Sequence, residues 1–367
     1  MTTISLRCLN RTLLERQFLT ERTNRSPHAV IRQLVALQAQ EPNWPYVGLW
    51  SRLEGFRRDD LGALLHDRSV VRSTMLRRTM HLAGADDCRW LRPTVRPIVQ
   101  VALKHAYFAD EIGGMDLDEL ARAGRELLTG RTLTRRELGR LLAERFPGRH
   151  PGRLADTVEV MVPLVHAPAA GAWGGWGSRS GIEVALAEEW IGRPMSAAPR
   201  LETMVLRYLA AFGPAGVMDV QAWSGLTRLR EVVDRLRPTL RVFRTEGGKE
   251  LFDLPDAPIA DPDRPFPVRF LPAFDNALLG HRDRTRVISD QDRMRFARVA
   301  SAGVPMFLVD GFVHGTWSLQ GSTLLIAPLR PLANADAAAV EEEAEHLLAF
   351  IDPDTTDRAT AWVADGG

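Results

Sequence analysis

The sequence contains little cysteine and no long apolar run. Cys8 and Cys88 lie far apart and outside any Cys-x-x-Cys pattern. This argues against a disulfide framework and against a cysteine-rich zinc site, and it fits a reducing cytoplasm. No apolar segment approaches the roughly 18 residues that a membrane span needs. The N-terminus also lacks the continuous apolar core of a secretory signal. We therefore expect a cytoplasmic protein that does not enter a membrane.

Lysine is equally scarce, because Lys104 and Lys249 are the only lysines among 47 basic residues. Arginine, which suits planar bidentate contacts with phosphates or base edges, supplies the rest. A GC-rich genome accounts for the shortage of lysine but not for the distribution of charge. Residues 1–80 hold thirteen arginines against seven acidic residues, whereas beyond position 330 nine acidic residues face only Arg358. Because the net charge is only +1, this asymmetry predicts that a polyanion meets one face of the protein.

Familiar catalytic motifs are also absent. The sequence has no phosphate-binding GxxxxGK[ST] loop, no HExxH and no GxSxG, and its nine histidines show no paired ligand spacing. We therefore expect neither a metal nor another cofactor. With 367 residues, of which 45% are hydrophobic and 25% charged, the chain has the composition of a globular protein with two or three domains or more.

Hydrophobic periodicity predicts an α+β, mostly helical fold that begins with tandem winged-helix domains. The first unit, residues 1–115, shows three helices, then a β-hairpin, then a long helix: 8–20, 28–40, 58–66, strands 69–73 and 80–82, and helix 93–110. The second unit, residues 116–195, repeats this order. It has three helices, at 117–128, after a cap at Thr134 and at 153–166, and then a glycine-rich turn at 171–177 and a strand at 182–186. Three helices followed by a hairpin is the order of a winged helix.

A third unit is predicted for residues 196–258, and a different one after it. The third shows helices 199–212 and 226–237 around the segment 217–223, and strands 240–244 and 250–254. The proline-rich stretch 255–262 then predicts a boundary. Residues 259–367 are expected to form a small β-barrel-like sheet from strands 268–271, 306–309, 312–317 and 323–326, closed by helix 335–349. Asp310-Gly311 is a strong two-residue hairpin signal.

Two glutamines separated by one residue, Gln38 and Gln40, stand just before Pro42. Because a proline disfavours helical geometry in the residue before it, we expect the helix 28–40 to end here. Side chains at positions i and i+2 of a helix point about 200° apart. Unwinding at the helix end would let the two amides converge on one target, whereas the alternative is a pair of ordinary surface glutamines.

Five segments of the sequence together resemble one known family. They are Leu37-Gln38-Ala39-Gln40, the segment 70–82 with its Arg-x-Thr and His-Leu pairs, Trp223-Ser224-Gly225, the segment 271–284 with Leu-Pro-x-x-Asp and Arg-Asp-Arg, and Gly315-Thr316-Trp317. In this order they resemble the AlkZ-type bacterial DNA glycosylases, a tandem winged-helix family first linked to azinomycin self-resistance. The resemblance spans residues 8 to 350. Some members have aspartate at the second motif position, so Gln40 places this sequence nearer the self-resistance branch.

The resemblance implies a DNA glycosylase that hydrolyses the N-glycosidic bond of N7-alkylguanine, including the unhooking of interstrand crosslinks or bulky adducts from a genotoxic natural product. Gln38 and Gln40 are then the expected catalytic residues, which position the attacking water. Since no lysine is placed for Schiff-base chemistry, we expect a monofunctional enzyme. Its partner would be double-stranded DNA carrying alkylated guanine, and we expect a monomer because no dimerisation segment is present.

Contacts with DNA are expected from the arginines and from one hairpin: Arg72, Arg77, Arg78, Arg282, Arg284, Arg286 and His314. Each assignment has an alternative. Arg72, Arg77 and Arg78 could instead be surface residues that contact solvent alone. Arg282, Arg284 and Arg286 alternate as on one strand face and could instead form cross-strand ion pairs. The hairpin that carries His314 could be a packed hairpin of the barrel rather than a probe of a DNA groove. His81 is more consistent with a core histidine than with a catalyst.

A non-catalytic winged-helix DNA-binding protein, either a transcription regulator or a lesion binder, is the alternative function. A regulator would normally bind two half-sites as a dimer. Sharp sequence-specific binding would favour the regulator, whereas salt-sensitive, lesion-dependent binding would favour the glycosylase.

Overall fold

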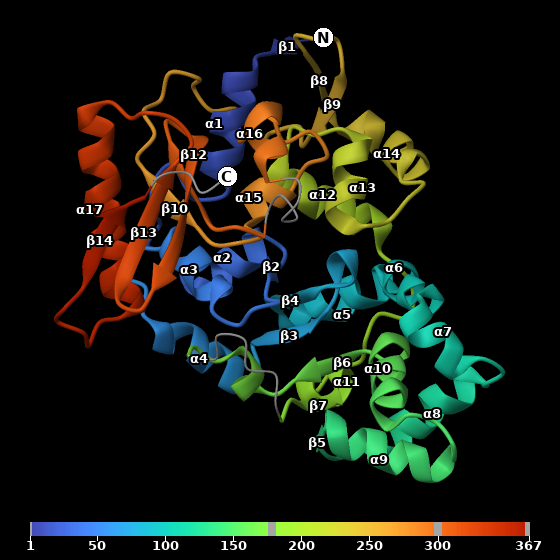
Figure 1. Cartoon of the computed structure of the whole chain (residues 1–367). Helices are drawn as coiled ribbons and strands as arrows, with labels where there is room; N and C mark the ends of the chain where they lie inside the picture. The colour runs from blue at the N-terminus through green and yellow to red at the C-terminus, as the bar shows by residue number, and fades with distance from the viewer. Residues whose placement is uncertain (1, 175–180, 297–302, 364–367) are drawn as a thin grey trace.

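The structure is a computed structural model, and it describes residues 2–174, 181–296 and 303–363. It is an α+β fold in which helices predominate and the strands form three sheets. Figure 1 shows the C-terminal sheet at the left and a separate helical lobe at the lower right, with the N-terminal helices between them. No helix in the described part of the chain is long and apolar enough to cross a membrane.

A six-stranded sheet occupies the centre, in the order β2-β4-β3-β6-β7-β5. Its strands are β2 (Leu37–Gln38), β3 (Val70–Thr74), β4 (Met80–Gly84), β5 (Leu133–Thr134), β6 (Leu164–His166) and β7 (Glu183–Leu186). The contact between β3 and β6 is a single antiparallel pair, Arg72 with His166. The hairpins of the first two predicted units therefore lie in one shared sheet. The winged-helix assignment of these units stays a prediction.

The helices of the first predicted unit surround part of this sheet, and some of them share a hydrophobic core with the C-terminal sheet. They are α1 (Leu6–Arg16), α2 (Pro27–Gln33), α3 (Trp44–Trp50) and α4 (Arg58–His66), followed by α5 (Ala85–Thr94), α6 (Arg96–Gln100), the 3-10 turn η2 (Val101–Lys104) and α7 (Ala106–Ile112). Ser26 caps α2, with Pro27 in its first turn, as the sequence predicts.

The lobe at the lower right of Figure 1 contains α8 (Leu117–Leu128), α9 (Arg135–Arg145) and α10 (Pro151–Met161), and its strand β7 leads into α11 (Ala187–Ile191). Thr134 and Glu137 form the predicted capping box at the start of α9. The lobe has a hydrophobic core of its own, drawn entirely from residues 120–186. The rest of the chain is different, because its two large cores each combine residues from the N-terminal and C-terminal segments.

The third predicted unit contains α12 (Leu201–Phe212), α13 (Val217–Ser224), α14 (Arg230–Leu236), β8 (Arg241–Thr245) and β9 (Glu250–Asp253). Its β-hairpin gains a strand from the start of the chain, because β1 (Thr2–Ile4) pairs parallel to β8. The sequence did not predict β1. The four-part division at residues 115, 195 and 258 itself stays a prediction.

The C-terminal sheet has the order β10-β11-β12-β13-β14. It is formed by β10 (Arg269–Leu271), β11 (Met306–Val309), β12 (Phe312–Gln320), β13 (Thr323–Pro328) and β14 (Ala359–Trp362), and it packs against α17 (Asn334–Ile351). The Asp310-Gly311 hairpin is confirmed, with φ of 49° and 78° as a type I′ turn requires. Among the described residues β10 and β14 are the sheet's two edges, so closure into a barrel is not confirmed.

Several predicted helices are shorter or more divided than the periodicity suggests. The helix expected at 28–40 ends at Gln33, because Val35 has φ of 69° and the chain then turns into β2. The helix expected at 153–166 ends at Met161, since Pro163 forces Val162 into an extended conformation. The helix expected at 93–110 is instead three short segments. The helix expected at 226–237 begins only at Arg230, and residues 175–177 of the predicted glycine-rich turn lie outside the described residues.

A buried ion pair joins the first unit to the C-terminal segment. The guanidinium of Arg52, just after α3, donates to both carboxylate oxygens of Asp275 at 2.8 and 2.9 Å, and both side chains are almost fully buried. Asp275 also caps α15 (Asn276–Leu279) through the amide of Ala277. Two charges buried together are tolerated because each is the hydrogen-bond partner of the other.

We predict that Asp275→Ala lowers the free energy of unfolding by about 3–5 kcal/mol, because it leaves the Arg52 charge buried without its partner. Denaturant unfolding followed by circular dichroism measures the change. Glu144→Ala is the matched control, since it removes the exposed i,i+4 pair with Arg140 on α9 and should cost only about 0.5 kcal/mol or less. Equal effects of the two variants would contradict the assignment.

Candidate functional site

Gln38 and Gln40 lie on an extended segment, not on a helix end. Gln38 pairs with His81 across β2 and β4, and the amide of Ala39 donates to the Met80 carbonyl at 2.8 Å. Side chains at positions i and i+2 of a strand point to the same face. Accordingly Ala39 is buried while both glutamines are half-exposed. The expected helix end is therefore wrong, because Gln38 is the last residue of β2 and Gln40 lies just beyond it, and the convergence of the two amides stays a prediction.

The hydrogen bonds fix which way each carboxamide points. Gln38 Oε1 accepts from Arg77 Nη2 at 3.2 Å, and Gln40 Oε1 accepts from the Met80 amide at 3.3 Å. Arginine and backbone N–H groups only donate, so the oxygen of each amide must face them. Each oxygen keeps a second lone pair. Within the described residues neither NH2 group makes a hydrogen bond, so both amides retain donor and acceptor capacity for a ligand.

Arg77 lies on the tight turn η1 (Leu76–Arg78) between β3 and β4, in a left-handed conformation with φ of 51°. Its second nitrogen, Nη1, donates to the Trp223 carbonyl at 2.6 Å. Gly225 follows α13 with φ of 82°, and a Cβ there would stand 3.2 Å from the Arg77 Cα. The Trp-Ser-Gly turn therefore packs on the backbone of η1. Arg77 therefore links the Trp-Ser-Gly turn to Gln38. Arg77 is a non-glycine residue in a left-handed conformation, and such residues are typical of functional sites.

Burial and the nearby Arg284 charge lower the pKa of Arg77 to about 10. Arg77 therefore stays a cation at neutral pH. It was predicted to follow phosphates, but in the structure its hydrogen bonds go to Gln38 and to the Trp223 carbonyl. The contact of Arg77 with DNA stays a prediction.

Arg72 is also closer to the motif than predicted. Its side chain is 5% exposed, and it donates from Nε and Nη2 to the Ala39 carbonyl at 3.0 and 2.9 Å and from Nη2 to the Gln40 carbonyl at 3.3 Å. A buried side chain with these partners is not a surface group that follows phosphates or only solvates the surface. Arg72 instead holds the backbone of the motif against β3.

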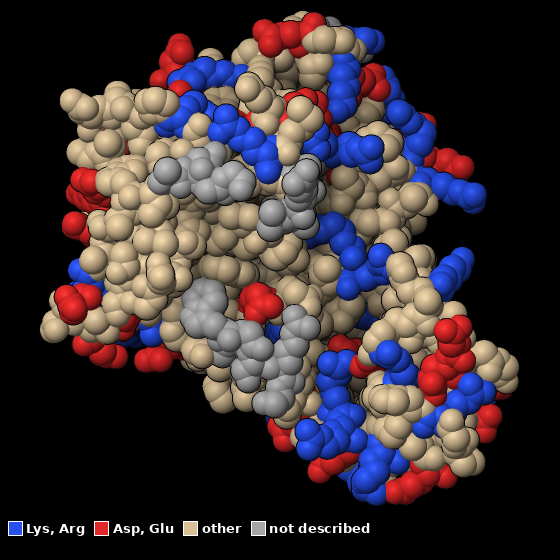
Figure 2. Space-filling view, in the orientation of Figure 1, with Lys and Arg blue, Asp and Glu red and all other residues tan. Residues whose placement is uncertain are grey.

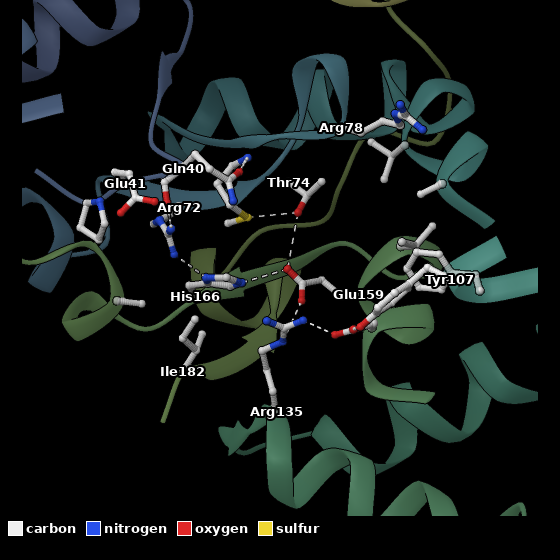
Figure 3. Close-up of a pocket in the computed structure, with 18 residues that line it drawn as sticks. Gln40, Glu41, Arg72, Thr74, Arg78, Tyr107, Arg135, Glu159, His166 and Ile182 are labelled. Carbon is white, nitrogen blue, oxygen red and sulfur yellow. Dashed lines mark hydrogen bonds and ion pairs between the residues drawn. The ribbon is translucent and has the colours of Figure 1, made fainter. Parts of the chain in front are cut away.

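A buried polar network continues from Arg72 into the lobe. Arg72 Nη1 lies 2.7 Å from His166 Nδ1, and His166 Nε2 lies 2.9 Å from Glu159 Oε1. Arg135 then bridges Glu159 and Asp156. Figure 3 shows these linked side chains along one wall of a pocket beside Gln40. The pocket has a volume of about 320 Å³, and its apolar lining includes Met80, Val99, Tyr107, Phe108 and Ile182.

Burial alone would raise the pKa of Glu159, but the His166 ring, Arg135 and Arg72 outweigh it and lower the pKa to about 2. Glu159 is therefore an anion at neutral pH. The sequence analysis missed His166 because the expected helix 153–166 included it. The proline at position 163, read as a helix stop, would have placed Leu164–His166 in a strand.

The remaining predicted arginines divide into exposed and buried ones. Arg282 is exposed and Arg284 half-exposed, but Arg286 is buried and donates to the Pro214 carbonyl at 3.1 Å. Residues 281–288 contain no strand, so their expected alternation on a strand face is wrong. Arg78 is half-exposed and lies 2.6 Å from the His105 ring. Figure 2 shows basic side chains near the middle of this face, between the positions of α13 and α5 in Figure 1.

The Asp310-Gly311 hairpin packs against α1. Asp310 forms ion pairs with Arg7 and Arg11, and a Cβ on Gly311 would stand 2.4 Å from an Arg11 nitrogen. His314 is half-buried, its Nε2 donates to the Arg330 carbonyl at 3.2 Å, and burial and the Arg330 charge lower its pKa. These contacts favour the packed hairpin over the groove probe.

His81 has the structure of a core histidine. It is fully buried, and Nδ1 donates to the Thr79 carbonyl at 2.8 Å. Burial, followed by the Arg77 charge, lowers the pKa of His81 to about 3, so the ring is neutral. No group of histidine, cysteine and acidic residues that could hold a metal ion occurs in the part of the chain that the structure describes.

Comparison with known proteins gives consistent matches over nearly the whole chain. A family described as DNA glycosylase AlkZ-like matches residues 31–350. The "Interstrand DNA cross-link repair glycosylase" of Streptomyces sahachiroi is 26% identical over 366 residues, covering 91% of this chain and 93% of that protein. The solved structure of Streptomyces sahachiroi DNA glycosylase AlkZ superimposes with a TM-score of 0.80 at 23% identity, covering 99% of this chain and 100% of the other.

We predict that the network makes stability depend on pH through Glu159. Because the folded-state pKa of Glu159, about 2, lies below the usual 4.5, its contribution is present above pH 4.5 and is lost as the pH falls toward 2. The wild type should exceed Glu159→Gln in unfolding free energy by an amount on the order of 3 kcal/mol at neutral pH. Denaturant unfolding between pH 7 and pH 3 tests this, and an advantage that does not shrink on acidification would contradict it.

Proposed function

This chain belongs to the AlkZ-like family of DNA glycosylases, and we propose that it hydrolyses the N-glycosidic bond of N7-alkylated guanine in duplex DNA. One observation supports this most strongly. Gln38 and Gln40 lie two residues apart on an extended segment, and each amide is oriented by a hydrogen bond to its oxygen. The name of the Streptomyces sahachiroi relative extends the proposal to the unhooking of interstrand crosslinks. Bulky adducts of a genotoxic natural product belong to the same substrate class.

The chemistry of the lesion suits amides as catalytic groups. Alkylation at N7 places a positive charge on the purine, which makes the base a good leaving group without a strong general acid. What remains is to place a water at the anomeric carbon and to stabilise a cationic, oxocarbenium-like sugar. The second lone pair on each glutamine oxygen can accept a hydrogen bond from that water. Fixed carbonyl dipoles beside the sugar also stabilise positive charge as it develops.

The location of the motif suits a tethered substrate. A crosslinked base is held by the opposite strand and cannot easily be flipped into a deep pocket. Both glutamines are half-exposed, and the pocket beside Gln40 is open. Arg78, Arg282 and Arg284 are then the proposed contacts with the DNA backbone. Phosphate contacts of this kind position the duplex without reading its sequence, so binding should weaken as the salt concentration rises.

Neither lysine supports Schiff-base chemistry at this site. Lys104 follows α6 in η2, Lys249 faces Asp283 near the β8–β9 turn, and neither lines the pocket beside Gln40. We therefore propose a monofunctional, monomeric enzyme that leaves an abasic site without cutting the strand. The rival function, a non-catalytic DNA-binding protein, makes no use of two oriented amides on an open face.

We predict that the wild type releases N7-methylguanine from alkylated duplex DNA and that the Gln38→Ala, Gln40→Ala variant does so at least about a hundredfold more slowly. Release under single-turnover conditions measures the rate, and binding to the same duplex measures affinity. Affinity should change little, because neither glutamine is charged. Release at the wild-type rate by the double variant would show that the reaction occurs elsewhere.

We predict that Arg77→Lys slows excision by about tenfold or more while DNA affinity stays close to that of the wild type. One guanidinium holds two acceptors at once, Gln38 Oε1 and the Trp223 carbonyl. A lysine keeps the charge but has a single nitrogen on a flexible stem, so Gln38 loses its orientation. Arg140→Lys on the exposed face of α9 makes the same exchange away from the site. An affinity loss without a rate loss would assign Arg77 to phosphate binding instead.

A further inference from the structure

The strand that leads into the Gln38–Gln40 motif is very short. β2 contains only Leu37 and Gln38, and it is the edge strand of the six-stranded sheet. Beyond Gln38 the ladder ends, so the carbonyls of Ala39 and Gln40 need donors from elsewhere. Arg72 supplies them from β3 with three hydrogen bonds. The position of the motif therefore depends on how firmly the Arg72 guanidinium is held.

His166 holds the other end of that guanidinium, and the geometry defines its protonation. Arginine has five N–H donors and no acceptor. At 2.7 Å from Arg72 Nη1, the His166 Nδ1 must therefore accept, which means that it carries a lone pair. The proton of the neutral ring is then on Nε2, where it donates to Glu159 Oε1 at 2.9 Å. Glu159 selects this tautomer because it is an anion that can only accept at that position.

We propose that Glu159, His166 and Arg72 form a positioning relay that holds the backbone of the Gln38–Gln40 motif, and that protonation of His166 switches it off. The proposal rests on the proposed glycosylase function. A protonated imidazole donates from both nitrogens, so the Nδ1–H would face the Arg72 N–H. The attraction between His166 and Arg72 then becomes a repulsion between two cations, and Arg72 no longer holds the Ala39 and Gln40 carbonyls.

The charged groups around His166 in the described part of the chain include Arg78, which lines the same pocket as His166. Arg72 on β3 and Glu159 on α10 contact the ring directly, and Arg135 on α9 contacts Glu159 behind it. Asp156 on α10 pairs with Arg135, and Glu41 lines the same pocket. His166 itself is 5% exposed. The two glutamines do not titrate, so an acid-side loss of rate in this site would originate in the relay.

The relay also explains why residues of the lobe stand beside the motif. Glu159 and His166 come from α10 and β6, about 120 residues after Gln38 in sequence, and the lobe has its own core. Arg72 and His166 are the register pair between β3 and β6 in the sheet, and Ser73 Oγ of β3 also donates to the Leu164 carbonyl of β6 at 2.6 Å. The relay thus couples the placement of the lobe to the placement of the two amides.

The test compares two substitutions at one position. His166→Asn keeps a side-chain oxygen near the position of Nδ1, so it can still accept from Arg72, and it does not titrate. His166→Ala removes the acceptor. Single-turnover excision of N7-methylguanine is followed between pH 5 and pH 8, the range in which histidines change charge. Affinity for the alkylated duplex is measured alongside. Glu126→Gln, which removes the exposed partner of Arg145 in the same lobe, is the control.

We expect the wild-type rate to fall on acidification, the His166→Asn rate to stay nearly level, and the two to be similar at pH 8. His166→Ala should be slower by about tenfold or more at pH 8, with unchanged affinity for DNA. A merely structural role for His166 would lower stability without removing the acid limb. The relay is overturned if His166→Asn retains the wild-type acid limb, or if His166→Ala excises at the wild-type rate.

A second measurement does not depend on catalysis. In protein labelled with ¹⁵N-histidine, the resonance that disappears in His166→Asn reports the tautomer of His166. A neutral ring with its proton on Nε2 at pH 8 supports the relay, whereas a proton on Nδ1 overturns it. If the wild type excises nothing, the proposed function fails on that result alone, and the tautomer still decides whether Glu159, His166 and Arg72 are arranged as proposed.

Discussion

The bond between the Arg72 guanidinium and two backbone carbonyls is the interaction on which the site depends. Backbone carbonyls that are withdrawn from water must find donors, and β2 is too short to provide them through a ladder. A planar group with several fixed donors meets this need better than a lysine would. Because Arg72 reaches the motif from β3 and His166 from β6, three strands converge on a segment that has almost no regular structure of its own.

Burying Arg72 requires electrostatic compensation, and the structure supplies it as an alternating series. Arg72 is followed by His166, the anion Glu159 and the cation Arg135. Arg77 is different, because it is held by two neutral oxygens and faces Arg284. One side of the motif is therefore held by a series of charged side chains, and the other by a single buried guanidinium with two oxygen partners.

Much of the fold is encoded in local signals that act within one turn or one hairpin. The helix at residues 58–66, the amphipathic helix 117–128, the capping box at Thr134 and the Asp310-Gly311 turn all occur where the sequence places them. Predictions that extended a helix for as long as apolar residues recurred at helical spacing were less successful. The helices expected at 28–40, 93–110 and 153–166 are all interrupted: the first at Val35, the second at Val95 and His105, and the third before Pro163.

The sequence by itself determined the fold class and many of the helices and turns, because capping and turn chemistry are local properties, and its Gln-Ala-Gln segment made Gln38 and Gln40 the candidates. Only the tertiary structure decided how those glutamines point and what holds them. Two residues cannot form a strand alone, so β2 exists because β4 lies beside it. Arg72 turned inward because the Ala39 and Gln40 carbonyls needed donors, and Arg286 because it found a buried carbonyl. Partners supplied by distant segments are invisible to periodicity, and here they set the geometry of the site.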